Sequence, residues 1–278
     1  MSRIEKRFAA LKEEGRAGLV AYLTAGDPDL ETSTRLFEGV AAAGADLIEI
    51  GMPFSDPMAD GPLIQAAGLR ALQNGMTLRK TLDLVRHLRV RDPDTPYVLM
   101  GYYNPIYRYG AEVFAKDAAA SGVDGLIIVD LPPEEEQELA DPAERAGLDL
   151  VRLATPTSDE HRLPVIVQRA SGFIYYVAIA GITGTRAVDP DAARAAVTRL
   201  RKFTDLPVAV GFGIKNPEQA AEVARAADAA VVGSALVDRL ARNLDPSGKA
   251  KPELIDAVLG DIAALAKGIR GARHGNSA

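Results

Sequence analysis

The chain has 278 residues, 47% of them hydrophobic, with a formal net charge of −6 and no cysteine. This length suits two ordinary domains or one barrel of about 250 residues. The mild acidic excess argues against a nucleic-acid partner, because it leaves no broad basic surface. The lack of cysteine excludes disulfides, thiolate metal sites and cysteine nucleophiles. The three histidines, His87, His161 and His274, are scattered, so we expect no metal site.

The N-terminal residues resemble an ordinary helix more than a targeting segment. Charges stand among the first positions, and Ile4, Phe8 and Leu11 follow helical spacing instead of forming a continuous apolar core. No apolar run reaches the ~18 residues of a membrane span. We therefore expect a cytoplasmic protein that does not bind a membrane.

The predicted elements alternate along the chain. Ser2 and Glu5 form a capping-box pattern for a helix that ends near Gly15, and a strand follows at 19–24. Further helices are expected at 30–43, 62–73, 77–90, 110–121, 134–146, 159–170, 191–202, 217–227, 235–242 and 253–269. Further strands are expected at 46–51, 97–101, 125–130, 148–153, 173–178, 206–211 and 229–233.

Short strands rich in Val, Ile and Leu that alternate with helices indicate a parallel sheet covered by helices. We predict an α/β fold, a (β/α)8 TIM barrel with an extra N-terminal helix and additional C-terminal helices. No linker divides the chain, so residues 1–278 are expected to form a single domain, with a flexible tail from about 271. A doubly wound open sheet is the alternative.

One predicted strand contains a carboxylate, Glu49. Strand alternation places Leu47 and Glu49 on one face and Ile48 and Ile50 on the other. Glu49 is then expected to face the barrel interior near the mouth, where barrel enzymes hold their catalytic groups. The alternative is a structural Glu that bonds to backbone or to an arginine.

The loop after this strand supplies a second carboxylate, Asp60. Two carboxylates over one barrel mouth suit a general acid–base beside a group that stabilises positive charge. Alternatively, Asp60 only caps the helix that Pro62 begins. For Asp56, which precedes Pro57, the residues alone favour a loop or capping role.

Glycines follow the last three strands, in GITGT (181–185), GFGI (211–214) and VVGSA (231–235). Barrels often bind phosphate in the loops after strands seven and eight, and a helix that begins at Ser234 would offer free N–H groups. We therefore predict a phosphate ester substrate, although glycines also simply make turns. Lys215 could be a Schiff-base lysine, but a solvated lysine is the favoured interpretation.

Several apolar or aromatic side chains are expected near strand ends, where they could line a pocket for a flat apolar group. Most residues in such positions merely fill the barrel. The candidates are Tyr22, Met100, Tyr102, Ile127, Val129, Tyr175 and Phe212.

The segment LIEIGMPFSDPMADGP (47–62) resembles the signature of tryptophan synthase α chains, and the resemblance covers nearly the whole chain. It extends to YLTAGDP (22–28), MGYYNPIYRYG (100–110), GLIIVDLPPEE (125–135), LATPTS (153–158), YYVAIAGITGTR (175–186), GFGI and VVGSA. The resemblance implies a (β/α)8 barrel that reversibly cleaves indole-3-glycerol phosphate into indole and D-glyceraldehyde 3-phosphate. It implies no cofactor in this chain and a PLP-containing β-chain partner in an α2β2 tetramer, which joins indole to serine.

By the same resemblance, the catalytic residues are Glu49 and Asp60, with Tyr175 beside them. The substrate would contact Tyr22, Met100, Tyr102, Ile127, Thr183 and Phe212, and its phosphate Gly184, Gly213, Gly233 and Ser234. The implied partner interface contains Pro53, Asp56, Asn104 and Pro132. Tyr22 and Met100 depart from the Phe and Leu that are common in the family.

Residues 179–189 are expected to form a lid that closes over Asp60, with Thr183 reaching its carboxylate and Gly181 and Gly184 giving backbone freedom. An ordinary surface loop is the alternative. For the function, two alternatives stay open: an α-like chain that releases free indole by itself, and a non-catalytic activator of the β chain.

Overall fold

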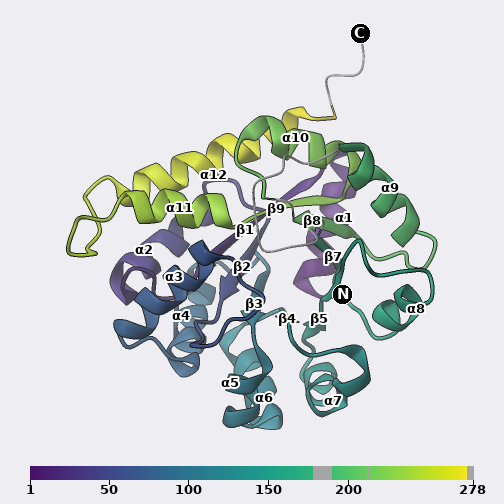
Figure 1. Cartoon of the computed structure of the whole chain (residues 1–278), viewed down its shortest axis with the longest axis horizontal. Helices are drawn as coiled ribbons and strands as arrows, with labels where there is room; N and C mark the ends of the chain where they lie inside the picture. The colour runs from purple at the N-terminus through teal and green to yellow at the C-terminus, as the bar shows by residue number, and fades with distance from the viewer. Residues whose placement is uncertain (178–189, 212, 274–278) are drawn as a thin grey trace.

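The computed structural model describes residues 1–177, 190–211 and 213–273. Their strands form one parallel sheet in the order β5-β4-β3-β2-β1-β9-β8-β7-β6. β5 (Asp149–Leu150) and β6 (Arg152–Ala154) are the two ends of one segment that is interrupted at Val151, so the sheet closes on itself. The strands lie at the centre with helices around them (Figure 1). This confirms the predicted (β/α)8 barrel and excludes the open sheet.

The bounds of the other elements follow the predicted alternation. The strands are β1 (Gly18–Thr24), β2 (Leu47–Gly51), β3 (Tyr97–Gly101), β4 (Gly125–Ile128), β7 (Ile174–Val177), β8 (Val208–Gly211) and β9 (Ala229–Val232). The first helices are α1 (Arg3–Glu13), α2 (Leu30–Val40), α3 (Pro62–Gln73), α4 (Leu78–Arg91), α5 (Tyr103–Tyr109) and α6 (Ala111–Ser121). A 3-10 turn, η1 (Pro133–Glu135), precedes α7 (Gln137–Arg145), α8 (Arg162–Val167), α9 (Pro190–Leu200), α10 (Pro217–Ala226), α11 (Ser234–Arg242) and α12 (Leu254–Gly271).

Two helices differ from the prediction. Helix α5 was not expected; its first N–H, on Tyr103, donates to the carboxylate of Asp130 at 2.8 Å, a contact between distant parts of the chain. Helix α8 is shorter than the predicted 159–170, because the carboxylate of Asp159 accepts hydrogen bonds from the N–H groups of His161 and Arg162 and shapes the preceding residues into turns.

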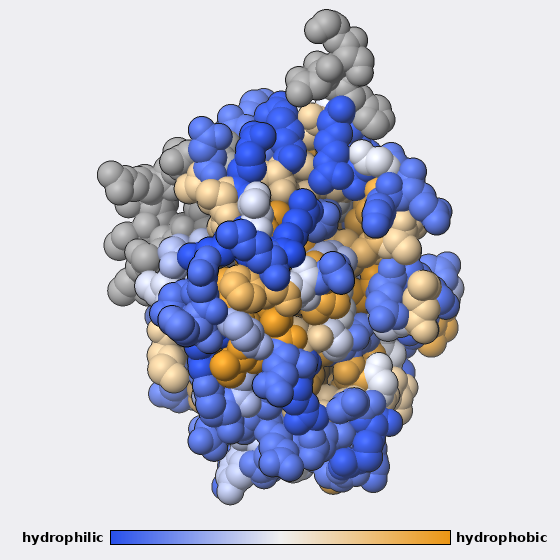
Figure 2. Space-filling view, turned by 90° about the vertical axis from the view of Figure 1, so that its right-hand side faces the viewer, coloured by the Kyte–Doolittle hydropathy of each residue, from blue (hydrophilic) through white to orange (hydrophobic). Residues whose placement is uncertain are grey.

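The strand residues divide between two apolar cores, as strand alternation predicts. Leu47 packs inside the barrel with residues such as Val98 and Val231, whereas Ile48 and Ile50 pack outward against the helices. The helices hide this outer core. On the side that carries α8 and α9, hydrophilic residues cover most of the surface and apolar side chains are visible between them (Figure 2).

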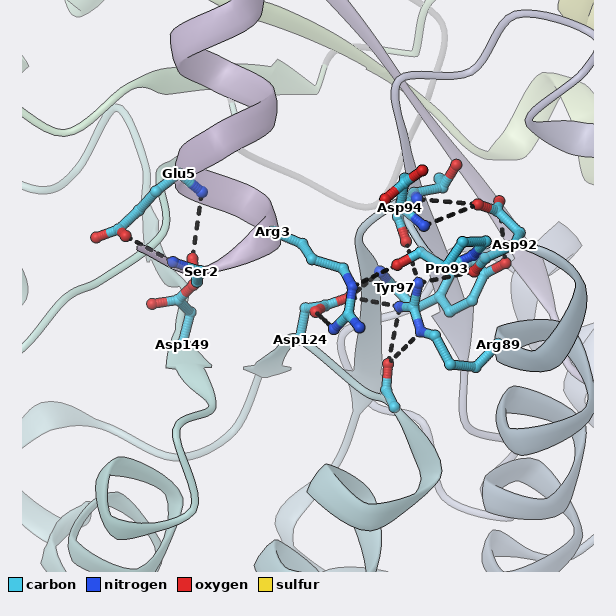
Figure 3. Close-up of polar contacts among 12 residues, drawn as sticks. Ser2, Arg3, Glu5, Arg89, Asp92, Pro93, Asp94, Tyr97, Asp124 and Asp149 are labelled. Atoms are coloured by element: carbon cyan, nitrogen blue, oxygen red, sulfur yellow. Dashed lines mark hydrogen bonds and ion pairs between the residues drawn. The ribbon is translucent and has the colours of Figure 1, made fainter.

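Helix α1 closes the end of the barrel at which the strands begin. Ile4, Phe8 and Leu11 are buried in the interior core. Two polar residues at the start of α1 donate hydrogen bonds to aspartates located where strands begin. Ser2 Oγ donates to Asp149 at 2.7 Å, and Arg3 donates to Asp124 at 2.9 Å (Figure 3). Because α1 plugs this end, the interior of the barrel is open to a ligand only from the opposite mouth.

The C-terminal helix continues into packed residues. Ala272 is buried, and the guanidinium of Arg273 donates to the backbone oxygens of Ala224 and Ala227. The tail expected from about 271 can therefore begin only after Arg273, and residues 274–278 lie outside the described part of the chain. Within the described ranges, no helix combines the length and apolar content needed to cross a membrane.

Candidate active site

A cavity of about 900 Å³ opens at the mouth where the strands end. It is the site expected for a barrel enzyme, because the βα loops meet there. The predicted residues that line it come from both halves of the chain: Tyr22, Glu49, Asp60, Met100, Val129, Pro132, Tyr175, Gly213, Gly233 and Ser234.

Glu49 is fully buried on β2, in register with Tyr22 on β1 and Val98 on β3. Neither carboxylate oxygen of Glu49 has a hydrogen-bond partner among the described residues. The alternative of a structural Glu bonded to backbone or arginine is therefore wrong. Burial raises the pKa of Glu49 to about 8, so at neutral pH the side chain is mostly a protonated acid that faces the cavity.

Asp60 reaches the same cavity from the loop between β2 and α3. Burial raises the pKa of Asp60 to about 6, while a hydrogen bond from Tyr102 lowers it in part. The Tyr102 hydroxyl also accepts the N–H of Ala59 at 3.0 Å, which ties this loop to β3. Gly61, not Asp60, is the N-cap of α3, so the capping alternative is wrong for Asp60.

The phenol rings of Tyr22 and Tyr175 flank Glu49, and each ring has room only because the residue opposite it is a glycine. A Cβ on Gly51 would lie 2.2 Å from the hydroxyl of Tyr22, and a Cβ on Gly211 would lie 2.4 Å from that of Tyr175. Burial raises the pKa of both phenols. The two rings therefore form neutral walls of the cavity, and they hold their positions only because the facing strands lack side chains there.

The end of the cavity near β8 and β9 suits an anion. Gly213 has a φ of 57°, which glycine adopts readily. Helix α11 begins at Ser234, and its first hydrogen bonds run from Leu236 and Val237 to the oxygen of Gly233. The preceding N–H groups, on Ser234 and Ala235, are thus left without intrahelical acceptors at the positive end of the helix dipole.

Some predicted pocket residues lie elsewhere. Ile127 is fully buried in the barrel interior and does not line the cavity, because it lies one inward-facing position below Val129. Tyr102 also does not line it and contacts the Asp60 loop instead. Thr183, Gly184, Phe212 and the proposed lid at 179–189 lie outside the described residues.

The structure adds lining residues that sequence reasoning missed, among them Leu153 and Ile64. A signal existed for Leu153, since strand alternation from Val151 makes it the next inward-facing position. No such signal existed for Ile64, because only the packing of α3 over β1 brings it to the mouth.

The residues expected at the partner interface lie on loops and helices that follow three neighbouring strands. Asp56 follows β2, Asn104 lies in α5 after β3, and Pro132 follows β4; all three are exposed, and Pro53 is half-buried. The order of β2, β3 and β4 in the sheet puts them on one side of the mouth.

Neither a metal nor a lysine centre is evident in the described part of the chain. No three His, Cys, Asp or Glu side chains there form a group that could hold a metal ion. Lys215 is exposed and lines a neighbouring cavity, not the one that contains Glu49.

Comparison with known proteins assigns the family. A family profile described as tryptophan synthase alpha chain matches residues 8–263. Tryptophan synthase subunit alpha from Legionella pneumophila str. Paris is 39% identical, with a TM-score of 0.88 over 97% of this chain and 98% of that one. Tryptophan synthase from Mycobacterium tuberculosis is 37% identical, with a TM-score of 0.87 over 97% and 98%. The chain therefore belongs to the tryptophan synthase alpha chain family.

Proposed function

We propose that Glu49 and Asp60 carry out the lyase half-reaction that this family catalyses, the reversible cleavage of indole-3-glycerol phosphate into indole and D-glyceraldehyde 3-phosphate. One observation carries the proposal. The carboxyl group of Glu49 has no hydrogen-bond partner among the described residues and a pKa of about 8, and it lines the same cavity as a second carboxylate, that of Asp60. Keeping an unpaired carboxyl group buried costs stability, which is typical of a catalytic group.

The proposed reaction uses one proton of Glu49. The neutral carboxyl group protonates C3 of the indole ring, which becomes a cationic indolenine, and the carboxylate of Asp60 stabilises the charge at the ring N–H. Glu49, now ionised, takes the proton from the C3′ hydroxyl. The bond between C3 and C3′ then breaks, and its electron pair returns to the ring. Indole and the aldehyde leave, and Glu49 is protonated again.

The rest of the cavity fits the two ends of this substrate. We assign the phosphate to the N–H groups around Gly213, Gly233 and Ser234, together with Gly184, and the indole ring to the walls formed by Tyr22, Met100 and Tyr175. The family needs no cofactor in this chain. Tyr175 is assigned to the wall beside Glu49, since its phenol stays protonated.

The proposal includes a partner. The family implies a β chain, and we propose an α2β2 tetramer in which this chain passes indole to a PLP-containing β subunit. The position of Pro53, Asp56, Asn104 and Pro132 on one side of the mouth supports a docking surface there. A cytoplasmic location and a single domain over 1–278 stay predictions.

The decisive experiment measures indole release from indole-3-glycerol phosphate by the chain alone and with purified β chain. Glu49→Gln and Asp60→Asn should each lower kcat by about 10²-fold or more, while circular dichroism shows a native fold. Near-normal turnover by Glu49→Gln would refute the assignment.

The two alternative functions give different outcomes in the same assay. A wild-type chain that releases no indole but stimulates the β chain would be a non-catalytic activator. A fully active chain that the β chain does not stimulate would be a stand-alone indole-releasing lyase. We expect weak activity alone and stimulation by the partner.

A further inference from the structure

A second cavity, of about 890 Å³, adjoins the anion-binding end of the first. The two share Gly61, Gly213 and Ser234, so the start of α11 borders both. The charged side chains that line the second cavity are Lys215, Arg239, Arg242, Asp238 and Asp261. A phosphate group at the start of α11 would therefore lie close to these charges.

Most of these charges neutralise one another. The guanidinium of Arg239 donates two hydrogen bonds to Asp261, at 2.8 and 2.9 Å, and Arg242 pairs with Asp238 at 2.6 Å. The arginines that line the first cavity are also paired, Arg162 with Glu134 and Arg152 with Glu136.

Lys215 differs from these arginines. Among the described residues that line either cavity, it is the one cation without a carboxylate partner. Its positive charge is therefore available to a ligand, whereas the charge of each arginine is already matched by an acid.

The backbone of Lys215 is held firmly although its side chain is exposed. The preceding Ile214 is buried, and the N–H of Lys215 donates to the side-chain oxygen of Gln219 at 2.7 Å. The N–H of Gln219 donates in turn to Asn216, the N-cap of α10, at 2.9 Å. Thus an ammonium group that has no carboxylate partner in the described part of the chain is attached to a fixed backbone two residues after Gly213.

We propose that Lys215 is a specificity-determining residue that attracts and retains the phosphate dianion of the substrate. The role is electrostatic and complements the free N–H groups of α11, which are neutral dipoles. It rests on the proposed function, because it presupposes a phosphate ester at this mouth. It assigns Lys215 no part in bond breaking, in contrast to a Schiff-base lysine.

The reverse reaction tests the proposal, since only one of its two substrates carries a phosphate. In the condensation of indole with D-glyceraldehyde 3-phosphate at low ionic strength, Lys215→Gln should raise the KM for the aldehyde by about threefold to tenfold. The KM for indole and kcat should not change. The inhibition constant of inorganic phosphate should rise similarly, and added salt should reduce the difference from wild type.

Two further variants separate this role from a general loss of charge. Lys215→Arg should restore most of the affinity for the aldehyde. Lys202→Gln removes an exposed lysine near the beginning of β8, at the opposite end of the barrel, and should behave as wild type.

Three results would overturn the proposal. An unchanged KM for the aldehyde in Lys215→Gln, with normal wild-type turnover, would make Lys215 an inert surface residue and leave the proposed function intact. A large loss of kcat together with a borohydride-trapped adduct at Lys215 would make it a Schiff-base lysine. A wild-type chain that catalyses no condensation would defeat the proposed function, and the role of Lys215 with it.

Discussion

At the scale of one residue, the catalytic role proposed for Glu49 opposes the stability of the fold. Its pKa is about 8 in the folded protein, against an ordinary value of 4.5. The fold therefore favours the neutral carboxyl group. The contribution of Glu49 to stability is fully present below the unfolded pKa, and it decreases as the pH rises from about 4.5 through 8. At neutral pH, part of this stability is therefore already lost.

The raised pKa predicts a limit on activity at high pH. Because the proposed cycle begins with protonated Glu49, kcat/KM should decrease as the pH rises through about 8. Carboxyl ¹³C chemical shifts of the labelled protein should show one glutamate that titrates near pH 8, identified by its absence in Glu49→Gln. If that resonance titrated near 4.5 instead, Glu49 could not serve as the starting acid at neutral pH.

At the scale of elements, Asp124 joins four segments at the sealed end of the barrel. Located just before β4, it accepts hydrogen bonds from Arg3 at the start of α1, from Arg89 in α4 and from the N–H of Tyr97 in β3 (Figure 3). Asp124 is buried, and Arg89 is only 12% exposed. The cluster is sensitive to the loss of the Asp124 carboxylate, because Arg3 and Arg89 both pair with it and Arg89 is only slightly accessible to water.

Replacing this anion should be costly. Asp124→Asn should lower the free energy of unfolding by about 3 kcal/mol, measured by urea denaturation, because it removes the carboxylate that pairs with the largely enclosed guanidinium of Arg89. Asp83→Asn is the matched control, since Asp83 pairs with Arg86 while both side chains are more than half exposed. The control should change stability by about 0.5 kcal/mol or less. Equal effects of the two variants would contradict this account.

Helix α12 offers a second matched pair, Gly268 and Gly260. A Cβ on Gly268 would lie 2.6 Å from the backbone oxygen of Pro217, so Gly268→Ala must push α12 away from α10. A Cβ on the exposed Gly260 meets nothing within 4 Å. We expect Gly268→Ala to destabilise by about 1–3 kcal/mol and Gly260→Ala to stabilise by about 0.5–1 kcal/mol. Thermal unfolding of both variants tests the prediction, and a stabilised Gly268→Ala would disprove the close contact.

At the scale of the whole molecule, the contacts that stabilise the fold and the proposed active site lie at opposite ends of the barrel. Buried ion pairs and helix α1 close one end, and the cavity opens at the other. Exposed apolar side chains also occur on the mouth side, with Met58 75% exposed in the loop after β2 and Tyr107 60% exposed in α5 after β3. They lie on the segments that carry Asp56 and Asn104, which suits a surface that a partner covers.

A charge on this surface should weaken partner binding. Met58→Glu should raise the Kd for the β chain about tenfold or more, measured by calorimetry, because a carboxylate would have to enter an apolar contact. Val90→Glu is the control: Val90 is 84% exposed near the end of α4, on the approach to the sealed end of the barrel. A Kd that is equally unaffected by both changes would mean that the β chain binds elsewhere.

Local patterns were sufficient to predict much of this protein. Strand alternation predicted that Leu47 and Glu49 face inward and that Ile48 and Ile50 face the helices, because a strand's side chains alternate whatever surrounds them. The family motif, which includes Glu49 and Asp60, identified the chemistry. The strand count and spacing predicted the barrel, since parallel strands require helical crossovers.

The sequence by itself determined which residues face the interior of the barrel, because that depends on the period of the backbone. Only the tertiary structure decided what those residues meet there. Three features depend on contacts between distant segments. The carboxyl group of Glu49 has no hydrogen-bond partner among the described residues, the rings of Tyr22 and Tyr175 lie over Gly51 and Gly211, and α5 begins where the N–H of Tyr103 donates to Asp130. The solvation and charge of a side chain depend on its neighbours in space. The pKa of about 8 at Glu49 therefore follows from its burial in the closed barrel and could not be read from the local sequence.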